Sequence, residues 1–444
     1  MAKKVIIVGG GAAGIGAAAK ILENSTDTEV LLLEATSKLG GRAKTSTKPI
    51  KGLAFDEGPV YIQDPLNPEN PWPKIADELG FETVKDKDQY KVRVDIDGVF
   101  KTVKTTDLPE ARQVENQLQE SFEHNKTINN RTVSQPPLPD GQNGKLGLAF
   151  SSYGPITEST EPTQYLASDR AREVSEDWGH NLFVKKGLGT LVRTYGDQLV
   201  SMYPFRLKVL LNTTVTEINY EQAAVEVSID NKKYTGDACI VTVSVGVLGN
   251  GNIHFVPNLP GDYNMALDFL KLGHYKKLAL QFNFLPPEIK DDTNYFLYNE
   301  DPEGVWQFYR LSYFPAKVLV VHTAGNFAQQ LDQMGDQEVF DLFRDSLRQA
   351  YAPNIDYLED KVSTTNWSGN PFFQGVYSYT TNDPNAPEDY NIPLKARRTM
   401  SIPIQNKIYF AGEAYHLEAY GTLHGAYEDG QQAADAVLKA LTQT

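Results

Sequence analysis

A run of glycines near the start of the chain has the spacing needed to hold the phosphates of a dinucleotide. It spans Gly9–Gly14, with the sequence GGGAAG, and lies between a β-branched segment and an alanine-rich segment. Gly9 permits a tight turn, Gly11 lets a pyrophosphate approach the backbone, and Gly14 allows a helix to pack closely on a strand. The N-terminus of that helix offers free N–H groups. We therefore expect Gly9, Gly11, Ala13 and Gly14 to bind a dinucleotide.

Two features that follow suit the same ligand. Glu34 comes directly after an apolar segment, 20 residues beyond the last glycine of the run, where an acidic side chain accepts hydrogen bonds from ribose hydroxyls. The alternative is a glycine-rich turn beside an ordinary surface glutamate. The turn Leu39–Arg42 then supplies Gly40, Gly41 and Arg42. Flavoproteins of this fold use such a turn against their dinucleotide, and here the sequence resembles the flavin-containing amine oxidases.

Four further segments extend the resemblance along the nucleotide-binding part of the chain. They are Asp56–Gly58, which is followed by Pro59–Tyr61 in departure from the family pattern, Val215–Ile218, Ile240–Leu248, in which Ser244 replaces the family's proline, and Phe410–Glu413. The resemblance implies FAD as the cofactor, with adenine against the backbone of Val215 and the ribityl chain against Glu413. It implies further FAD contacts from Gly58, Pro59, Val60, Tyr61, Gly412, Thr422 and Leu423.

The segment Tyr275-Lys276-Lys277 resembles the strand in which these oxidases place a lysine that holds a water against flavin N5. Alternation along a strand places Tyr275 and Lys277 on one face and Lys276 on the other. By alignment of the tyrosine, we assign the catalytic role to Lys277. The alternative is that both lysines are solvated charges at a strand end.

Trp367 precedes Val376-Tyr377 as the family's tryptophan precedes its flavin-facing segment. The resemblance makes Tyr377 one wall of an aromatic pair beside the flavin, with Tyr275 opposite it. Monoamine oxidases carry a flavin-linked cysteine where this chain has Val376. We therefore expect the FAD to be bound non-covalently.

The segment beginning at Gly421 should open the last helix and direct its N-terminus at the flavin. Thr422 stands where monoamine oxidases carry tyrosine, and threonine followed by x-His-Gly-Ala resembles spermine and acetylpolyamine oxidases and the histone demethylases. We assign packing rather than general-base catalysis to His424. Gln63 stands where polyamine oxidases often carry an ionisable residue, and Glu158 or Glu161 is a candidate to replace it.

The elements that must position these residues alternate between strand and helix. Lys4–Gly9, Ala12–Leu22 and Glu29–Leu33 predict a strand, a helix and a second strand. Later segments predict the strands Leu207–Leu211, Val215–Asn219, Ala224–Ile229, Cys239–Val245, Tyr275–Phe284, Lys317–His322 and Lys407–Gly412, and the helices Glu338–Tyr351, Gly425–Leu441 and one that contains Val114, Leu118 and Phe122.

The predicted fold class is α/β: a Rossmann-like FAD-binding domain of the glutathione-reductase type with an inserted α+β substrate-binding domain. We place the FAD-binding domain at residues 1–65, 190–258 and 372–444, and the substrate-binding domain at 66–189 and 259–371.

Composition excludes several classes of partner. The formal charge of −15 provides no basic surface for nucleic acid. The single cysteine, Cys239, excludes an internal disulfide or a multi-thiolate metal site, and we expect no metal. No run approaches the roughly 18 apolar residues of a membrane span, and no secretory signal begins the chain. We expect a cytoplasmic monomer or homodimer.

The predicted function is oxidation of a polyamine, such as spermidine, spermine or an acetylated form, with O2 reduced to H2O2. One alternative is a flavin oxidase of a monoamine or an L-amino acid, although no arginine can be placed beside the flavin to bind a carboxylate. Another is a chromatin demethylase, for which 444 residues leave no room for an extra helical arm. The last is a non-catalytic flavin-binding protein, which has no need of Lys277, Tyr377 or Thr422.

Overall fold

The computed structural model describes residues 2–96, 98–104, 179–230, 232–315, 317–381 and 392–443. The predicted helix with Val114, Leu118 and Phe122, and the candidates Glu158 and Glu161, lie outside the described residues.

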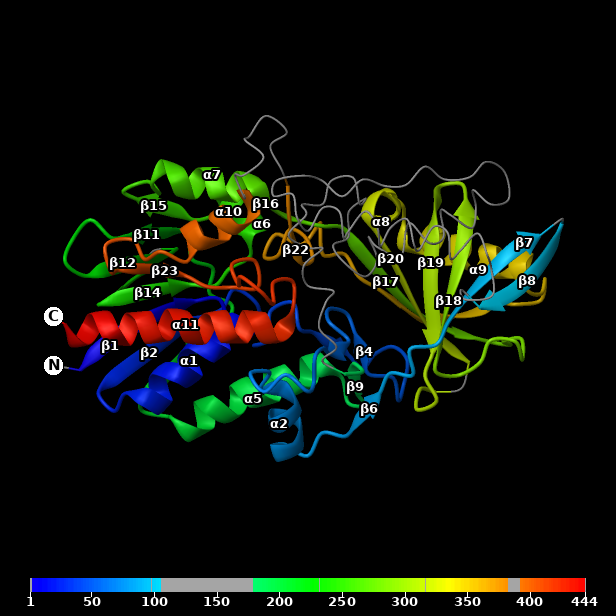
Figure 1. Cartoon of the computed structure of the whole chain (residues 1–444), viewed down its shortest axis with the longest axis horizontal. Coiled ribbons are helices and arrows are strands. Elements are labelled where there is room, and N and C mark those ends of the chain that lie inside the picture. The colour runs from blue at the N-terminus through cyan, green and yellow to red at the C-terminus, as the bar shows by residue number, and fades with distance from the viewer. Residues whose placement is uncertain are drawn as a thin grey trace.

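A parallel five-stranded sheet forms the end of the molecule at which both termini lie (Figure 1). Its order is β10 (Leu207–Leu210), β2 (Thr28–Leu33), β1 (Lys3–Val8), β14 (Ala238–Val241) and β23 (Ile408–Phe410). Each neighbouring pair is parallel. Both faces of the sheet are covered by other elements, so its strands are buried on both sides, as is typical of parallel sheets.

The two faces of this sheet have separate cores. Val5 and Ile7 pack against α1 (Ala12–Asn24), α5 (Leu188–Met202) and α11 (Leu423–Thr442). Ile6 and Val8 pack toward α6 (Val245–Gly249), α7 (Gly261–Phe269), α10 (Ile392–Met400) and a four-stranded sheet. That sheet has the order β13 (Lys232–Gly236), β12 (Val225–Ile229), β11 (Glu217–Asn219) and β15 (His254–Val256).

The α/β fold class is confirmed, and the strand–helix–strand unit β1–α1–β2 forms where the sequence predicts it. Several predicted strands are wrong at an end: Tyr275–Phe284 ends at Phe282, Lys317–His322 extends to Ala324, and Lys407–Gly412 spans only Ile408–Phe410. Two further ends also differ. The strand predicted from Val215 begins at Glu217, and the one predicted to reach Val245 ends at Val241. Ser244 explains the end at Val241, because its hydroxyl accepts a hydrogen bond from Val247 N and caps α6.

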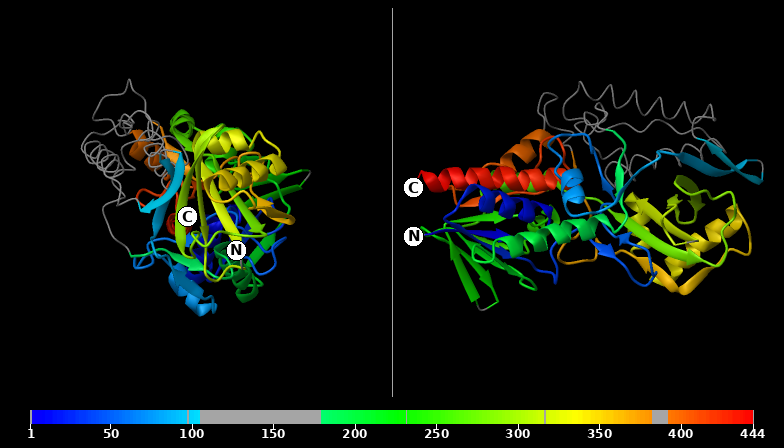
Figure 2. Two further views of the ribbon diagram at one scale, coloured as in Figure 1. Left: turned by 90° about the vertical axis from the view of Figure 1, so that its right-hand side faces the viewer. Right: turned by 90° about the horizontal axis from the view of Figure 1, so that it is seen from below.

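A seven-stranded sheet occupies the opposite end of the molecule (Figure 2). Its order is β21 (Tyr357–Thr364), β17 (Tyr275–Phe282), β20 (Val318–Ala324), β19 (Glu303–Arg310), β18 (Thr293–Glu300), β7 (Tyr90–Ile96) and β8 (Val99–Lys104). Leu278 and Leu280 pack on one face with α8 (Gly325–Leu331) and α9 (Asp336–Ala350). Ala279 and Val320 belong to a different core on the other face.

Short elements connect the two large sheets. They are β3 (Thr45–Ser46) paired with β4 (Phe55–Asp56), β5 (Tyr61–Ile62) and β6 (Thr83–Lys85) on either side of β9 (Leu182–Val184), β16 (Leu270–Leu272) paired with β22 (Ser378–Thr380), and α2 (Trp72–Glu78). The predicted boundaries between the two domains stay a prediction. Within the described part of the chain, no helix combines the length and apolar character that crossing a bilayer demands.

Candidate active site

One cavity of about 1170 Å³ receives residues from the parallel sheet, the connecting strands and the seven-stranded sheet. Nearly all of the predicted site residues line it. They are Gly9, Gly11, Ala13, Glu34, Gly40, Gly41, Arg42, Gly58, Pro59, Val60, Tyr61, Val215, Tyr275, Lys277, Trp367, Tyr377, Gly412, Glu413, Thr422 and Leu423. The exception is Gly14, which is not among the lining residues; a Cβ there would stand 2.0 Å from Gly9 O. Gly14 instead lies against the backbone of Gly9, which is the close packing of helix on strand that the sequence predicts.

The two glycine turns lie against each other at one end of the cavity. Gly40 N donates to Gly10 O at 2.9 Å, and Gly11 and Gly40 form a parallel bridge. Gly40 and Gly41 have φ of +121° and +58°, a region that favours glycine. Helix α1 begins after Gly11 without a side-chain cap, and Gly11, Ala12 and Ala13 at its N-terminus line the cavity.

Glu34 lies beside these turns, almost fully buried. Its Oε2 accepts from Gly10 N at 2.6 Å, and its Oε1 accepts from Thr36 N at 2.8 Å and Thr36 Oγ1 at 2.7 Å. These hydrogen bonds fix the Glu34 carboxylate at the end of β2, where Glu34 lines the cavity.

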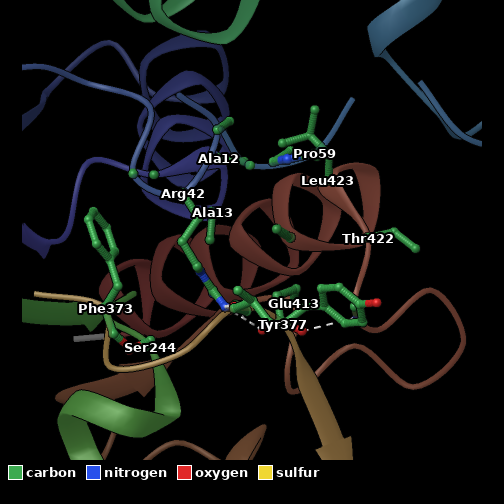
Figure 3. A pocket seen from close by; sticks show the side chains of 18 of the residues that line it. Ala12, Ala13, Arg42, Pro59, Ser244, Phe373, Tyr377, Glu413, Thr422 and Leu423 are labelled. Carbon is green, nitrogen blue, oxygen red and sulfur yellow. Dashed lines mark hydrogen bonds and ion pairs between the residues drawn. The ribbon is translucent and has the colours of Figure 1, made fainter. Parts of the chain in front are cut away.

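Arg42 and Glu413 form an ion pair across the cavity wall (Figure 3). Arg42 Nη1 lies 2.9 Å from Glu413 Oε1 and also donates to Val376 O. Glu413 Oε2 accepts from Ser378 Oγ at 2.6 Å and Gly421 N at 3.0 Å. Burial raises the pKa of Glu413, but Arg42 and Ser378 outweigh burial and hold this pKa below its ordinary value.

These features fit an FAD molecule. The uncapped N-terminus of α1 and the side-chain-free glycine turns leave room and N–H donors for a pyrophosphate. Glu34 supplies an acceptor for ribose hydroxyls, and Arg42 with Glu413 supplies a polar pair farther along the same wall.

Lys277 connects β17 to the loop after β4. Its Nζ donates to Asp56 O at 3.1 Å and to Gly58 O, while Trp367 Nε1 donates to Glu57 O at 3.0 Å. Three consecutive carbonyls of this loop are therefore held by two predicted site residues. Burial lowers the pKa of the Lys277 ammonium, although the nearby Asp56 and Glu57 carboxylates act in the opposite sense.

Lys276 points to the other face of β17, but it is not solvated. Its Nζ lies 2.9 Å from Asp332 Oδ1, with side-chain exposures of 2% and 8%, and it also donates to Thr365 O. The alternative of two solvated strand-end lysines is wrong, because Lys277 is 4% exposed as well. The strand lies inside the molecule rather than at its surface.

The rings of Tyr275 and Tyr377 face the cavity together, with centroids 6.2 Å apart. Tyr275 Oη contacts His322 Nδ1 at 2.6 Å. His322 and Gln307 also line the cavity from neighbouring strands. Sequence analysis missed both, because strand pairing brings them to the site and no local motif marks them.

Thr422 caps the last helix. Its hydroxyl donates to Ala419 O at 2.6 Å and accepts from Gly425 N at 3.0 Å. His424 is 2% exposed, and its Nε2 lies 3.9 Å from Asp64 Oδ2. Burial lowers the pKa of His424 to about 4. A neutral packed histidine agrees with the packing interpretation. Gln63 and Val376 line the cavity, whereas Cys239 is buried in β14 away from it.

Two other residues at the site carried no signal in the sequence, and one of them, Arg397, lines the cavity. Ser378 hydrogen-bonds Glu413, as described above. Arg397 of α10 is 1% exposed, donates to Ala414 O and stacks on Tyr420 at 3.6 Å from the ring centroid. No arginine was expected beside the flavin to bind a carboxylate, but Arg397 lies in the cavity wall together with Arg42.

The Rossmann-like sheet, the paired glycine turns and the acidic residue after β2 define a dinucleotide-binding oxidoreductase. Comparison with known proteins narrows this class: residues 12–438 match the family described as flavin containing amine oxidoreductase. The chain belongs to this family, and its cofactor is accordingly a flavin.

Individual relatives differ in their named activities. Polyamine oxidase 4 of Oryza sativa subsp. japonica is 28% identical over 455 residues, which cover 98% of this chain and 89% of that protein. Protein FLOWERING LOCUS D of Arabidopsis thaliana is 26% identical, and the match covers 97% of this chain but 54% of that longer protein. The solved cyclohexylamine oxidase from Brevibacterium oxydans IH-35A shares the fold, with a TM-score of 0.78, 17% identity and 100% of both chains covered.

Proposed function

We propose that this chain is an FAD-dependent oxidase of a polyamine, such as spermidine, spermine or an acetylated form. One observation carries the proposal: Tyr275, Lys277, Trp367 and Tyr377 line the same cavity as the dinucleotide-binding turns. The family match and the named relative Polyamine oxidase 4 support an amine as substrate. We propose that the FAD is held non-covalently by Glu34, Arg42, Glu413 and the glycine turns.

Bound FAD would accept a hydride at N5 and return two electrons to O2, giving H2O2. The protein's part is to bind and orient the amine. Tyr275 and Tyr377 would flank the carbon next to nitrogen, and Lys277, already fixed to two carbonyls, would hold a water at the reacting edge. The substrate loses hydride from carbon and a proton from nitrogen to become an imine, which water hydrolyses. Since the amine must first be neutral, activity should rise with pH.

An L-amino acid is a poorer fit to this cavity. Its carboxylate needs a cation, and within the described residues the lysines and arginines of the cavity wall are Arg42, Lys277 and Arg397. Arg42 pairs with Glu413, Lys277 donates to backbone carbonyls, and Arg397 donates to Ala414 O. A carboxylate would compete with these partners for the same cations.

Thr422 is proposed as part of the substrate wall rather than as a strong hydrogen-bond donor. Its proton is directed at Ala419 O, so a role in orienting the amine nitrogen would use only a lone pair of its oxygen. Threonine is also smaller than tyrosine, which leaves space for a long, polar amine.

A peroxide-coupled screen of purified protein tests the proposal. The panel contains spermidine, spermine, their acetylated forms, putrescine, benzylamine, phenylethylamine, L-amino acids and a methylated lysine peptide. We expect a polyamine to have the highest kcat/KM. A monoamine, amino acid or peptide that exceeds every polyamine by about tenfold would overturn the substrate class. A flavin-loaded protein that oxidises no amine would overturn the enzymatic function.

A further inference from the structure

A row of polar side chains crosses the seven-stranded sheet on its cavity face. In the register of the sheet, His322 on β20 stands directly opposite Lys277 on β17 and opposite Gln307 on β19. All three line the cavity. His322 is 4% exposed, so its hydrogen-bonding groups must find partners within the protein.

Both ring nitrogens of His322 have tyrosine partners. Nδ1 lies 2.6 Å from Tyr275 Oη, and Nε2 lies 3.3 Å from Tyr309 Oη. An uncharged imidazole carries one N–H and one lone pair. The ring therefore donates to one tyrosine and accepts from the other, and the choice fixes the direction of the Tyr275 hydroxyl.

The charge and the two distances indicate which arrangement is present. Burial lowers the pKa of His322 far below its ordinary value, and the Lys277 ammonium across the strand pair acts in the same sense. The shorter contact suits a phenol O–H that donates to an imidazole nitrogen, while the longer one suits a ring N–H that donates to a phenol oxygen. Tyr275 is therefore the donor and Tyr309 the acceptor.

We propose that His322 is a positioning residue: its Nδ1 accepts the Tyr275 hydroxyl proton and its Nε2–H donates to Tyr309, so that the Tyr275 oxygen offers lone pairs to a substrate N–H. This inference rests on the proposed function for the identity of the substrate. With the tyrosine proton turned away from the cavity, Tyr275 becomes an acceptor that suits a protonated or neutral amine nitrogen. A hydroxyl free to rotate would present its proton to that nitrogen part of the time.

A double-mutant cycle tests this coupling. His322→Phe keeps an aromatic ring but can neither accept nor donate a hydrogen bond, and we expect kcat/KM for the best amine to fall about threefold to tenfold, the range for one hydrogen bond. In a Tyr275→Phe background the same substitution should change kcat/KM by less than about twofold. His322→Asn, whose amide oxygen can stand in for Nδ1, should recover part of the loss. Additive effects of His322→Phe and Tyr275→Phe would overturn the proposal.

A second measurement does not depend on turnover. Nitrogen-15 NMR of histidine-labelled holoenzyme, with the His322 signals identified by their loss in His322→Asn, should show a neutral ring protonated at Nε2. Tyr275→Phe should shift the Nδ1 signal. A ring protonated at Nδ1 would overturn the proposal even in an active enzyme. If no amine is oxidised, the proposed function fails while the NMR result still decides the role of His322.

Discussion

At the scale of single residues, the two adjacent lysines of β17 have opposite environments. Lys277 lines the cavity and its Nζ donates to carbonyls of the neighbouring loop, whereas Lys276 Nζ forms a buried pair with Asp332. One pair of variants can therefore separate a role in catalysis from a role in stability.

Lys277→Met should retain FAD and lose kcat/KM by at least about tenfold, equivalent to roughly 1.4 kcal/mol of barrier, because the ammonium reaches the cavity. Lys276→Met leaves the Asp332 carboxylate buried without its partner, so the free energy of unfolding should drop by about 3–5 kcal/mol. Steady-state kinetics and urea denaturation measure the two effects. If Lys276→Met is the catalytically defective but stable variant, the assignment of the two lysines is reversed.

Val376 determines the expected linkage of the flavin. It lies in the cavity wall with no nucleophilic atom, and the chain's single cysteine is buried in β14. Acid precipitation of the yellow holoenzyme should therefore release FAD into the supernatant, as absorbance of the two fractions would show. A pellet that retains the flavin would contradict non-covalent binding.

The residues that line the cavity could be predicted where each belongs to a local sequence motif. The glycine turns, Glu34 and Lys277 line the cavity as the motifs and strand alternation imply. His322 and Gln307 were not predictable, because each reaches the cavity through the pairing of strands distant in sequence. Ser378 was not predictable either, because its partner Glu413 lies 35 residues away. The buried state of Lys276 depends on Asp332, 56 residues away, which no local pattern indicates.

At the scale of elements, α1 and α11 lie side by side over the parallel sheet, and glycines set their distance (Figure 1). A Cβ on Gly16 would stand 2.3 Å from Tyr427 O, and one on Gly430 would stand 2.0 Å from Ala13 O. Since α1 also begins at the glycine turn proposed to bind the dinucleotide, the spacing of these helices positions the turn itself.

Gly16→Ala should lower the free energy of unfolding by about 1–3 kcal/mol, because its new methyl group meets backbone that cannot rotate away. Gly261→Ala is the matched control, since nothing lies within 4 Å of a Cβ at that helix start. Urea denaturation of the apoprotein and FAD titration measure both effects. Equal stability of the two variants would contradict glycine-dependent packing of α1 on α11.

The first turn of α11 carries a pH-dependent contribution to stability. Burial lowers the pKa of folded His424 to about 4, below the value of about 6.5 in an unfolded chain. Between these values the unfolded state binds a proton that the folded state does not, so stability falls as the pH falls through this window. The slope is up to about 1.4 kcal/mol per pH unit.

His424→Gln should therefore flatten the dependence of unfolding free energy on pH between about 4.5 and 6, relative to wild type. His254→Gln, at an exposed histidine on β15, serves as the control. Chemical denaturation at several pH values measures the slopes. Parallel curves for wild type and His424→Gln would show that His424 is not the neutral buried group described here.

At the scale of the whole molecule, long-range order was predictable only in part. The parallel sheet could be predicted, because each of its strands is a short apolar segment that can be recognised locally and that alternates with helical segments. The seven-stranded sheet joins β7 and β8, from residues 90–104, to five strands from residues 275–364, and this pairing depends on tertiary packing. The cavity exists because both sheets contribute walls, so its full lining could not be predicted from motifs.

The net charge of −15 is a property of the whole molecule, and it should attract positively charged substrates toward the protein. Asp64, Glu69 and Glu418 add carboxylates at the cavity wall. A polycationic amine should be attracted more strongly than a singly charged one, since the interaction energy scales with the product of charges. Salt should weaken this attraction, because the Debye length shortens from about 10 Å at 0.1 M to about 3 Å at 1 M.

We therefore expect kcat/KM for spermine or spermidine to fall over this range of salt, and kcat/KM for a monoamine such as benzylamine to change less. Glu69→Gln, an exposed position at the cavity, should reduce the salt dependence for the polyamine. Glu221→Gln removes the same charge at an exposed position away from the cavity and should leave it nearly unchanged. Identical salt dependence for polyamine and monoamine would mean that the acidic field does not guide the substrate. Equal effects of the two glutamate variants would assign the guidance to net charge rather than to the cavity mouth.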